Sequence, residues 1–320
     1  MINEIWYDDF IKSLSTRYPK KTQLTQALID LLAIERESVY RRLRKDVSFS
    51  VHEIVKIASA WNISLDKITN INAGVVSFRM RPMDYSKLSE QETYYLNYII
   101  QSINNLKRFP DTEFMDVCNE LPRSLYAGFR HLYQFFLFKC TYQYGNEEKI
   151  CPLSQITVSE EEFQLATDYY QTIKQVPNTN FLFDHMIFEH LVSDIEYFHS
   201  IRMITDQEKA LLKQDLGKLL DYLLEIATKG RYPETQNKVT LYVFLLNIDT
   251  NYSYIYTQET KICFVHVFDK YEIHSYDSEM VANFKTWMQL KKRTSIQISE
   301  VDERSRIAFF DKQWKLIDRL

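Results

Sequence analysis

The chain has 320 residues and a formal net charge of −4, with 45% hydrophobic and 26% charged residues. This balance is typical of a globular protein rather than of a disordered chain. With only 5 Gly and 7 Pro, the chain is poor in tight-turn residues. We therefore expect a mainly α protein with a C-terminal α+β part, long enough for two or three domains.

No segment has the pattern of a secretory signal or a membrane span. The first residues, MINEIWYDDFIKSL, carry acidic side chains early and lack an apolar run. The most apolar segment, Leu241 to Ile248, is far shorter than the roughly 20 residues that cross a bilayer. Four scattered cysteines without a CxxC pair indicate reduced thiols. We expect a cytoplasmic protein that does not bind a membrane.

The first 70 residues are mildly basic, whereas the rest of the chain taken together is acidic. They hold 11 Lys/Arg and 9 Asp/Glu, whereas the remaining 250 residues hold 28 and 34. Apolar spacing predicts five short helices in this region, at about 4–15, 23–32, 35–45, 51–61 and 62–68. The sequence SVHE, Ser50 to Glu53, predicts a capping box at the start of the fourth helix. A polyanionic partner is expected to meet this region.

The third expected helix contains the densest group of cations. On a helical wheel, Val39 and Leu43 form a narrow apolar edge, and Glu37, Arg41 and Arg44 lie opposite to it. For an isolated helix, a solvated basic face is the usual explanation. A helix of this kind held closely after another short helix is what the DNA major groove admits. The residues expected to contact DNA are Arg36, Glu37, Ser38, Tyr40, Arg41, Arg42, Arg44 and Lys45.

The region from Gln23 to Ile68 resembles the helix-turn-helix domains of the Cro and lambda-repressor (XRE-like) family. The resemblance rests on the apolar positions Leu28, Ile29, Leu32, Ala33, Ile34 and Val39, and on the sequence SVHEIVKIASAWNISLDKI. It implies a recognition helix over about 35–45 that enters the major groove. Among the expected contact residues, the first four would read bases and the last four would attract phosphates. Ala33 stands where the family usually has a turn glycine, and it avoids strain only if its φ is negative.

The whole chain resembles a set of little-characterised bacterial helix-turn-helix (BetR-like) regulators. The sequences that carry this resemblance are ESVYRRLR, SFSVHEIVKIA, FRHLYQFFLFK and ISEVDERSRIAFF. It implies no known ligand for the region that follows the basic head. We therefore expect four parts: 1–70 as the DNA-binding domain, 71–86 as a linker, 87–230 as a helical region and 231–320 as an α+β domain.

Within the helical region, periodicity predicts helices at Glu90–Leu106, Leu125–Tyr144, Glu160–Gln175, Phe183–Arg202 and Asp206–Lys229. The last part changes character, because short β-branched and aromatic runs alternate with polar turns. They predict a small antiparallel sheet, built from KVTLYVFLLNI, YSYIYTQ, KICFVHVF and YEIHSY. Helices over Ser278–Leu290 and Val301–Leu320 flank a short strand, TSIQI. The aromatic strands could line an effector pocket, although sheet core is the commoner role for such residues.

Catalytic motifs are missing from the sequence. It contains no GxGxxG or GxxxxGK[ST] loop, no GxSxG and no HExxH, so we expect no enzyme and no cofactor. One helical stripe combines His185, Glu189, Glu196 and His199. Its Glu196-x-x-His199 spacing occurs in carboxylate-bridged metal sites, but no partner motif accompanies it. A polar helix flank is the preferred interpretation, and we expect no metal.

These observations predict a sequence-specific transcriptional regulator that binds double-stranded DNA. A homodimer is expected, because one head contacts one half-site. The C-terminal region would then dimerise or sense an unidentified effector. The alternative is a protein–protein interaction module, in which the helical region docks a partner protein.

Overall fold

The computed structural model describes residues 2–18, 20–61, 63–65, 68, 76–80, 88–145, 150–267 and 271–320. The chain divides into two compact units, Met1–Val76 and Ser77–Leu320, called unit 1 and unit 2 below. Within the described residues, no helix combines the length and the apolar character needed to span a bilayer.

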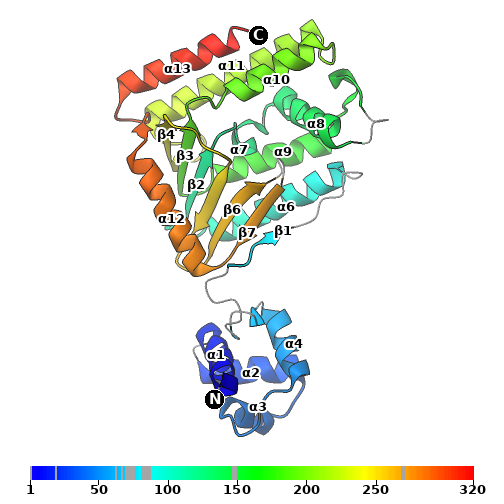
Figure 1. Ribbon diagram of the computed structural model, residues 1–320, viewed down its shortest axis with the longest axis vertical. Helices are drawn as coiled ribbons and strands as arrows, with labels where there is room; N and C mark the ends of the chain where they lie inside the picture. Colours follow the sequence, from blue (N-terminus) through cyan, green and yellow to red (C-terminus); the bar gives the residue numbers. More distant parts are fainter. Residues whose placement is uncertain are drawn as a thin grey trace. The chain divides into compact units, whose positions relative to one another are not determined.

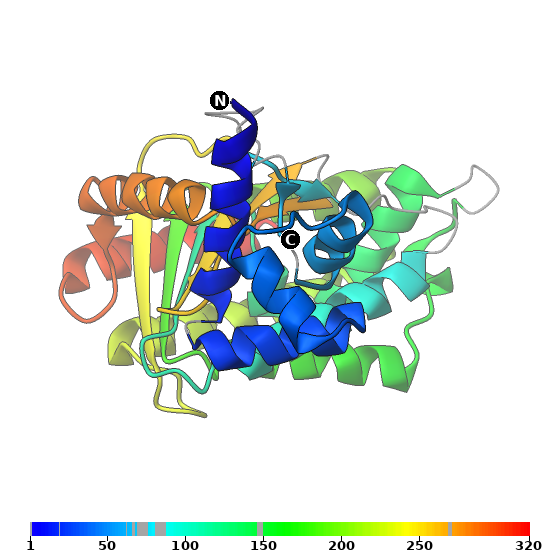
Figure 2. The same cartoon turned by 90° about the horizontal axis from the view of Figure 1, so that it is seen from below.

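Unit 1 is helical. Its helices are α1 (Ile2–Arg17), α2 (Lys21–Leu32), α3 (Arg36–Leu43) and α4 (Val51–Trp61). Helix α2 contacts the other three, and Figure 2 shows α1 and α2, the two darkest blue helices, running in clearly different directions. The buried core includes Phe10, Leu14, Leu28, Val39 and Ile57, all 0% exposed. Four expected helices are therefore present. Of the expected fifth, at 62–68, Leu65 and Ile68 are helical, Ile63 and Ser64 are not, and 62, 66 and 67 lie outside the described residues.

Local hydrogen bonds fix the start of α4. The amide of Glu53 donates to Ser50 Oγ at 3.2 Å, and the amide of Ser50 donates to Glu53 Oε2 at 2.8 Å. This reciprocal pair is the capping box that SVHE predicts. Nearby, the amide of Phe49 donates to the Tyr7 hydroxyl at 2.9 Å, which fastens the loop before α4 to α1.

The turn between α2 and α3 holds an alanine in the left-handed region. Ala33 caps α2 in the left-handed region, with φ 55° and ψ 44°, and its amide donates to the carbonyl of Ile29. The condition under which an alanine avoids strain at this position, a negative φ, is therefore not met. The left-handed cap satisfies a terminal carbonyl of α2, and an alanine in this conformation costs about 1 kcal/mol.

Unit 2 is built on one mixed eight-stranded sheet, with the order β1-β7-β6-β5-β2-β3-β4-β8. The central strands β2, β3 and β4 are parallel, and the other pairs are antiparallel. The strands are β1 (Arg79–Met80), β2 (Glu113–Cys118), β3 (Asn178–Asp184), β4 (Lys238–Phe244), β5 (Tyr252–Tyr256), β6 (Lys261–Val267), β7 (Tyr271–Ser275) and β8 (Ile296–Gln297). The helices are α6 (Leu88–Leu106), α7 (Arg123–Tyr126), α8 (Arg130–Tyr144), α9 (Glu160–Ile173), α10 (Glu189–Ser200), α11 (Asp206–Lys229), α12 (Ser278–Arg293) and α13 (Glu303–Ile317).

Side chains that alternate along the strands divide the core into two layers. On β2, Phe114 and Cys118 belong to the cluster shared with α6, α8, α9, α10, α11 and α13, whereas Met115 and Val117 belong to the cluster of α12. Helix α12 therefore covers one face of the sheet, and the other helices of unit 2 cover the opposite face (Figure 1).

The prediction of a small antiparallel sheet confined to residues 231–320 is wrong, because the observed sheet is larger and mixed. Strands β2 and β3 come from the region expected to be helical, and they separate β4 from β5 in the sheet. The expected helix over Phe183–Arg202 is wrong in its first part, where β3 ends at Asp184 and α10 begins only at Glu189. Parallel strands that are buried on both faces lack the alternation of apolar and polar residues. Hydrophobic periodicity therefore could not distinguish these strands from buried helices.

The remaining elements match the sequence more closely. The strands β4, β5, β6 and β7 are confirmed, as are the helices at α6, α9, α11, α12 and α13, within a few residues at their ends. The expected helix over Leu125–Tyr144 is interrupted between α7 and α8. A Cβ on Gly128 would lie 2.6 Å from Cδ1 of Tyr170, so α9 packs too closely here for a larger residue. Part of the expected linker, 71–75 and 81–86, lies outside the described residues, and Arg79 and Met80 within it form β1.

Candidate functional site

The α3 helix of unit 1 is shorter than the expected recognition helix. It begins at Arg36 and ends at Leu43, and Lys45 follows in the left-handed region with φ 67°. The amide of Asp46 donates to the carbonyl of Arg41 at 2.8 Å, and the amide of Lys45 donates to that of Arg42 at 3.1 Å. These bonds form a Schellman cap. Arg44 and Lys45 therefore lie beyond the last helical residue.

One face of α3 is buried and the opposite face is exposed. Val39 is 0% exposed and joins the core of unit 1. Glu37, Arg41 and Arg44 are exposed on the other side, as the helical wheel predicts. Ser38 and Tyr40 are half-buried on the flanks.

The cationic side chains in and after α3 differ in whether they form ion pairs with acidic residues of the protein. Arg44 lies 3.1 Å from Glu37 Oε1 and 3.1 Å from Asp46 Oδ2, and these hydrogen bonds raise the pKa of Arg44. Lys45 pairs with Asp8 of α1. By contrast, Arg36 and Arg41 are exposed, and neither has an ion pair with any residue that the structure describes.

Arg42, unlike the other cationic residues of this region, forms its ion pair with a residue of α4. Its Nη2 lies 2.9 Å from Glu53 Oε1, and both side chains are largely buried. Burial would raise the pKa of Glu53, but the Ser50 amide and Arg42 outweigh burial and lower it. The Arg42 guanidinium also lies 5.9 Å from the Phe49 ring centroid. Arg42 thus connects α3 to α4, a role that the sequence pattern alone did not indicate.

The stripe of His185, Glu189, Glu196 and His199 does not form a cluster on one helix. His185 precedes α10 in the chain, and His199 Nε2 lies 2.8 Å from Asp206 Oδ1. Arg319 lies 2.7 Å from Glu189 and 2.6 Å from Glu196, so both carboxylates already have a cationic partner. Among the described residues, no group of three or more His, Cys, Asp or Glu side chains is placed to hold a metal ion.

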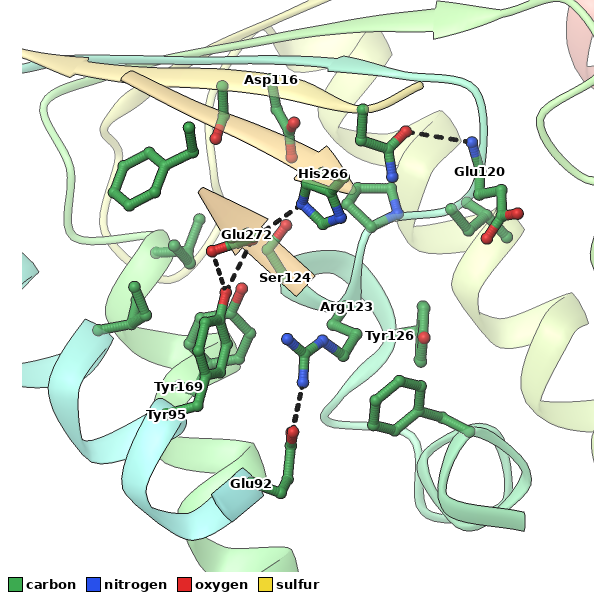
Figure 3. Close-up of a pocket in the computed structure, with 18 of the residues that line it drawn as sticks. Glu92, Tyr95, Asp116, Glu120, Arg123, Ser124, Tyr126, Tyr169, His266 and Glu272 are labelled. Carbon is green, nitrogen blue, oxygen red and sulfur yellow. Dashed lines mark hydrogen bonds and ion pairs between the residues drawn. The ribbon is translucent and has the colours of Figure 1, made fainter. Parts of the chain in front are cut away.

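Unit 2 contains a second candidate site, a cavity of about 110 Å³. It lies on the face of the sheet opposite to α12, between the strands β2, β5, β6 and β7 and the helices α6, α7, α8 and α9. Figure 3 shows Asp116 and His266 projecting from the sheet toward the cavity, opposite Arg123, Tyr95 and Tyr169. The sequence suggested only that the aromatic strands could line a pocket.

Most of the charged side chains that line this cavity belong to two ion pairs. Arg123 Nη1 lies 2.6 Å from both carboxylate oxygens of Glu92, and its guanidinium stacks 4.5 Å from the Tyr95 ring centroid. His266 Nε2 lies 2.8 Å from Glu272 Oε1. The Tyr95 hydroxyl donates to the same carboxylate, 3.0 Å from each of its oxygens. Each cation of the cavity wall thus has its own anion.

These pairs shift the protonation of the buried groups. Burial alone would lower the pKa of His266, but Glu272 outweighs burial and raises it. Burial would likewise raise the pKa of Glu272, and His266 lowers it instead. The Asp116 carboxyl behaves differently, because burial raises its pKa from 3.8 to about 7 even though the His266 charge opposes that shift. Near neutral pH, Asp116 is therefore divided between its charged and neutral forms.

The sequence alone does not identify these residues as one site, because they come from five elements spread over 180 positions. Glu272 and Tyr95, for example, are 177 residues apart. Comparison of the chain with protein-family models, with curated proteins and with solved structures finds no match.

Proposed function

We propose that this protein is a sequence-specific DNA-binding transcriptional regulator that places α3 in the major groove. The observation that carries the proposal is the exposed face of α3, on which Arg36 and Arg41 have no ion pair within the described residues. Val39 fixes the opposite edge of the helix in the core of unit 1. An arginine held on a rigid helix without an internal counter-ion is available to phosphates and to guanine edges.

The dimensions of α3 support the same proposal. An α-helix with its side chains is about 10–12 Å across, which fits the roughly 12 Å width of the major groove. The helix follows α2 after the short turn at Ala33, so α2 can carry it without a flexible connection. A short helix of this kind can enter the groove with its N-terminal residues toward the bases.

The contact residues divide by their surroundings. Arg36, Glu37 and Ser38 occupy the N-terminal turn of α3, where side chains reach base edges in helix-turn-helix complexes. Arg41 supplies phosphate attraction. Arg44 can do so only when a phosphate displaces its present carboxylate partners, and Arg42 instead supports the helix through Glu53.

A homodimer forms part of this proposal, since a second head doubles the contacted site and sets the half-site spacing. The alternative function, a module that docks a partner protein through the helices of residues 88–229, has less support. The apolar faces of α6, α8, α9 and α11 are buried against the sheet and against each other, which leaves them little surface for a partner.

Selection of bound fragments from a genomic DNA library tests the proposal. We expect the full-length protein to enrich a common sequence with two half-sites separated by one or more helical turns. Enrichment of no sequence above the input library would contradict sequence-specific binding. Recovery of one stoichiometric protein partner, with no enriched DNA, would favour the interaction module.

A further inference from the structure

The cavity of unit 2 contains an imbalance of charge. Its two protein cations are already neutralised, Arg123 by Glu92 and His266 by Glu272. A further carboxyl, that of Asp116, has no cation of its own in the wall. Asp116 is only 7% exposed, and within the described part of the chain its one hydrogen-bond partner is the weakly donating thiol of Cys118. A buried carboxylate in this situation is costly unless a charge from outside the protein compensates it.

A second polar group in the same wall lacks a partner. The Ser124 hydroxyl oxygen, on the first turn of α7, is fully buried and makes no hydrogen bond in the structure. Ser124 lines the same cavity as Asp116 (Figure 3). Buried polar atoms are nearly always satisfied in folded proteins. Two under-satisfied acceptors that face one cavity therefore indicate a missing hydrogen-bond donor.

The remaining surface of the cavity is apolar and aromatic, with Phe114, Phe136, Phe264 and Ile255 among its lining residues. Aromatic rings favour a cation through their negative faces, and the aliphatic wall favours a small hydrocarbon body. The cavity volume, about 110 Å³, is below the roughly 150 Å³ of a cavity that accommodates benzene, which limits the occupant to a few heavy atoms.

We propose that this cavity binds a compact organic cation, namely a primary amine with a short apolar body, whose ammonium donates hydrogen bonds to the Asp116 carboxylate and to Ser124 Oγ. The inference concerns unit 2 alone and holds whether or not unit 1 binds DNA. An anionic ligand is disfavoured, because Glu92 already engages the Arg123 guanidinium and three further carboxyl groups line the cavity.

Protonation adds a testable signature to this site. The ammonium requires the ionised form of Asp116, whose pKa is about 7, so binding of an amine should strengthen about tenfold between pH 6 and pH 8. Each of the other titratable groups around Asp116 either favours amine binding as the pH rises or keeps the same charge. His266 loses its charge as the pH rises, Glu272 stays ionised because its pKa is lowered, and burial raises the pKa of Cys118 and of Tyr169. Arg123 on α7 keeps its charge throughout, since Glu92 raises its pKa.

The test uses the full-length protein with three probes of similar size: butylamine, the neutral n-butanol and the anionic butyrate. Binding is measured at pH 6 and pH 8 by the chemical-shift changes of methyl groups that line the cavity. We expect butylamine to bind at least tenfold more tightly than n-butanol at pH 8, and to lose about tenfold at pH 6. Butyrate should not bind. Equal affinities for amine and alcohol, binding of butyrate alone, or binding of no probe would overturn the proposal.

Substitutions then assign the binding groups. Asp116→Asn should remove the preference for butylamine and its pH dependence, and it should leave n-butanol unaffected. Ser124→Ala should weaken butylamine about fivefold, as expected for one hydrogen bond. Asp168→Asn is the matched control, because Asp168 is exposed on α9 and does not line the cavity. If Asp116→Asn binds butylamine as tightly as the control does, the assignment is wrong.

Discussion

The Asp116→Asn variant should be more stable than the natural protein, by an amount that grows with pH. Burial raises the pKa of Asp116 from 3.8 to about 7, so the folded state binds a proton more tightly than the unfolded state does. The free energy of unfolding therefore falls as the pH rises through this window, by about 1.4 kcal/mol for each pH unit. Asparagine has nearly the shape of the protonated carboxyl and does not ionise.

The size of the effect follows from the two pKa values. At pH 5 the natural protein has lost about 2 kcal/mol relative to the fully protonated form, and at pH 8 it has lost about 4 kcal/mol. Asp116→Asn should recover these amounts at each pH. Side-chain exposure does not reduce them much, because Asp116 is 7% exposed. The buried Asp116 carboxyl thus makes the protein progressively less stable as the pH rises from about 4 to about 7.

Urea unfolding of the full-length protein labelled with 5-fluorotryptophan measures this difference. The fluorine signals of Trp287 and Trp314 report on unit 2, separately from those of Trp6 and Trp61 in unit 1. Asp168→Asn serves as the control, with no pH-dependent gain expected. A stability advantage of Asp116→Asn that is equal at pH 5 and pH 8, or a variant less stable at pH 8, would refute the reasoning.

Three further substitutions test other parts of the structure. Ala33→Gly should raise the free energy of unfolding of unit 1 by about 1 kcal/mol, because it relieves the left-handed strain at the turn; a loss of stability in urea unfolding would contradict the positive φ. Gly128→Ala should lower the stability of unit 2 by about 1–3 kcal/mol in the same assay, since the new Cβ would meet the Tyr170 ring; an unchanged midpoint would mean that α9 can move away. Glu37→Gln should strengthen binding to random-sequence DNA in a fluorescence anisotropy titration, because it releases Arg44 from one carboxylate. No gain in affinity would argue against a role of Arg44 in phosphate binding.

Local signals in the sequence predicted much of the fold. Helix α11 begins and ends at the expected residues, where a capping box at Thr205 and Glu208 and a left-handed Gly230 mark its two ends. The strands β5, β6 and β7 alternate and turn as antiparallel neighbours do. These features depend on residues close together in the chain, so pattern and period are sufficient to find them.

The central parallel strands and the cavity depend on distant contacts instead. Strand β3 pairs with β2 and β4, and its apolar run is buried on both faces, which removes the period that identifies a strand. The cavity exists only because the sheet order places β2 beside β5 and brings His266 and Glu272 opposite α6. On α3, spacing predicted the exposed face, but the pairing of Arg42 with Glu53 required the position of α4.

The salt dependence of DNA binding tests the central claim most directly. Affinity for the selected duplex is measured between 50 and 200 mM salt for the natural protein, for Arg36→Ala with Arg41→Ala, and for Lys12→Ala with Lys56→Ala. The last variant removes two exposed cations outside α3. The arginine variant should bind on the order of 100-fold more weakly, and its plot of log affinity against log salt should be less steep by about 1 for each lost phosphate contact. An arginine variant that matches the lysine control in both affinity and slope would contradict the placement of α3 in the groove.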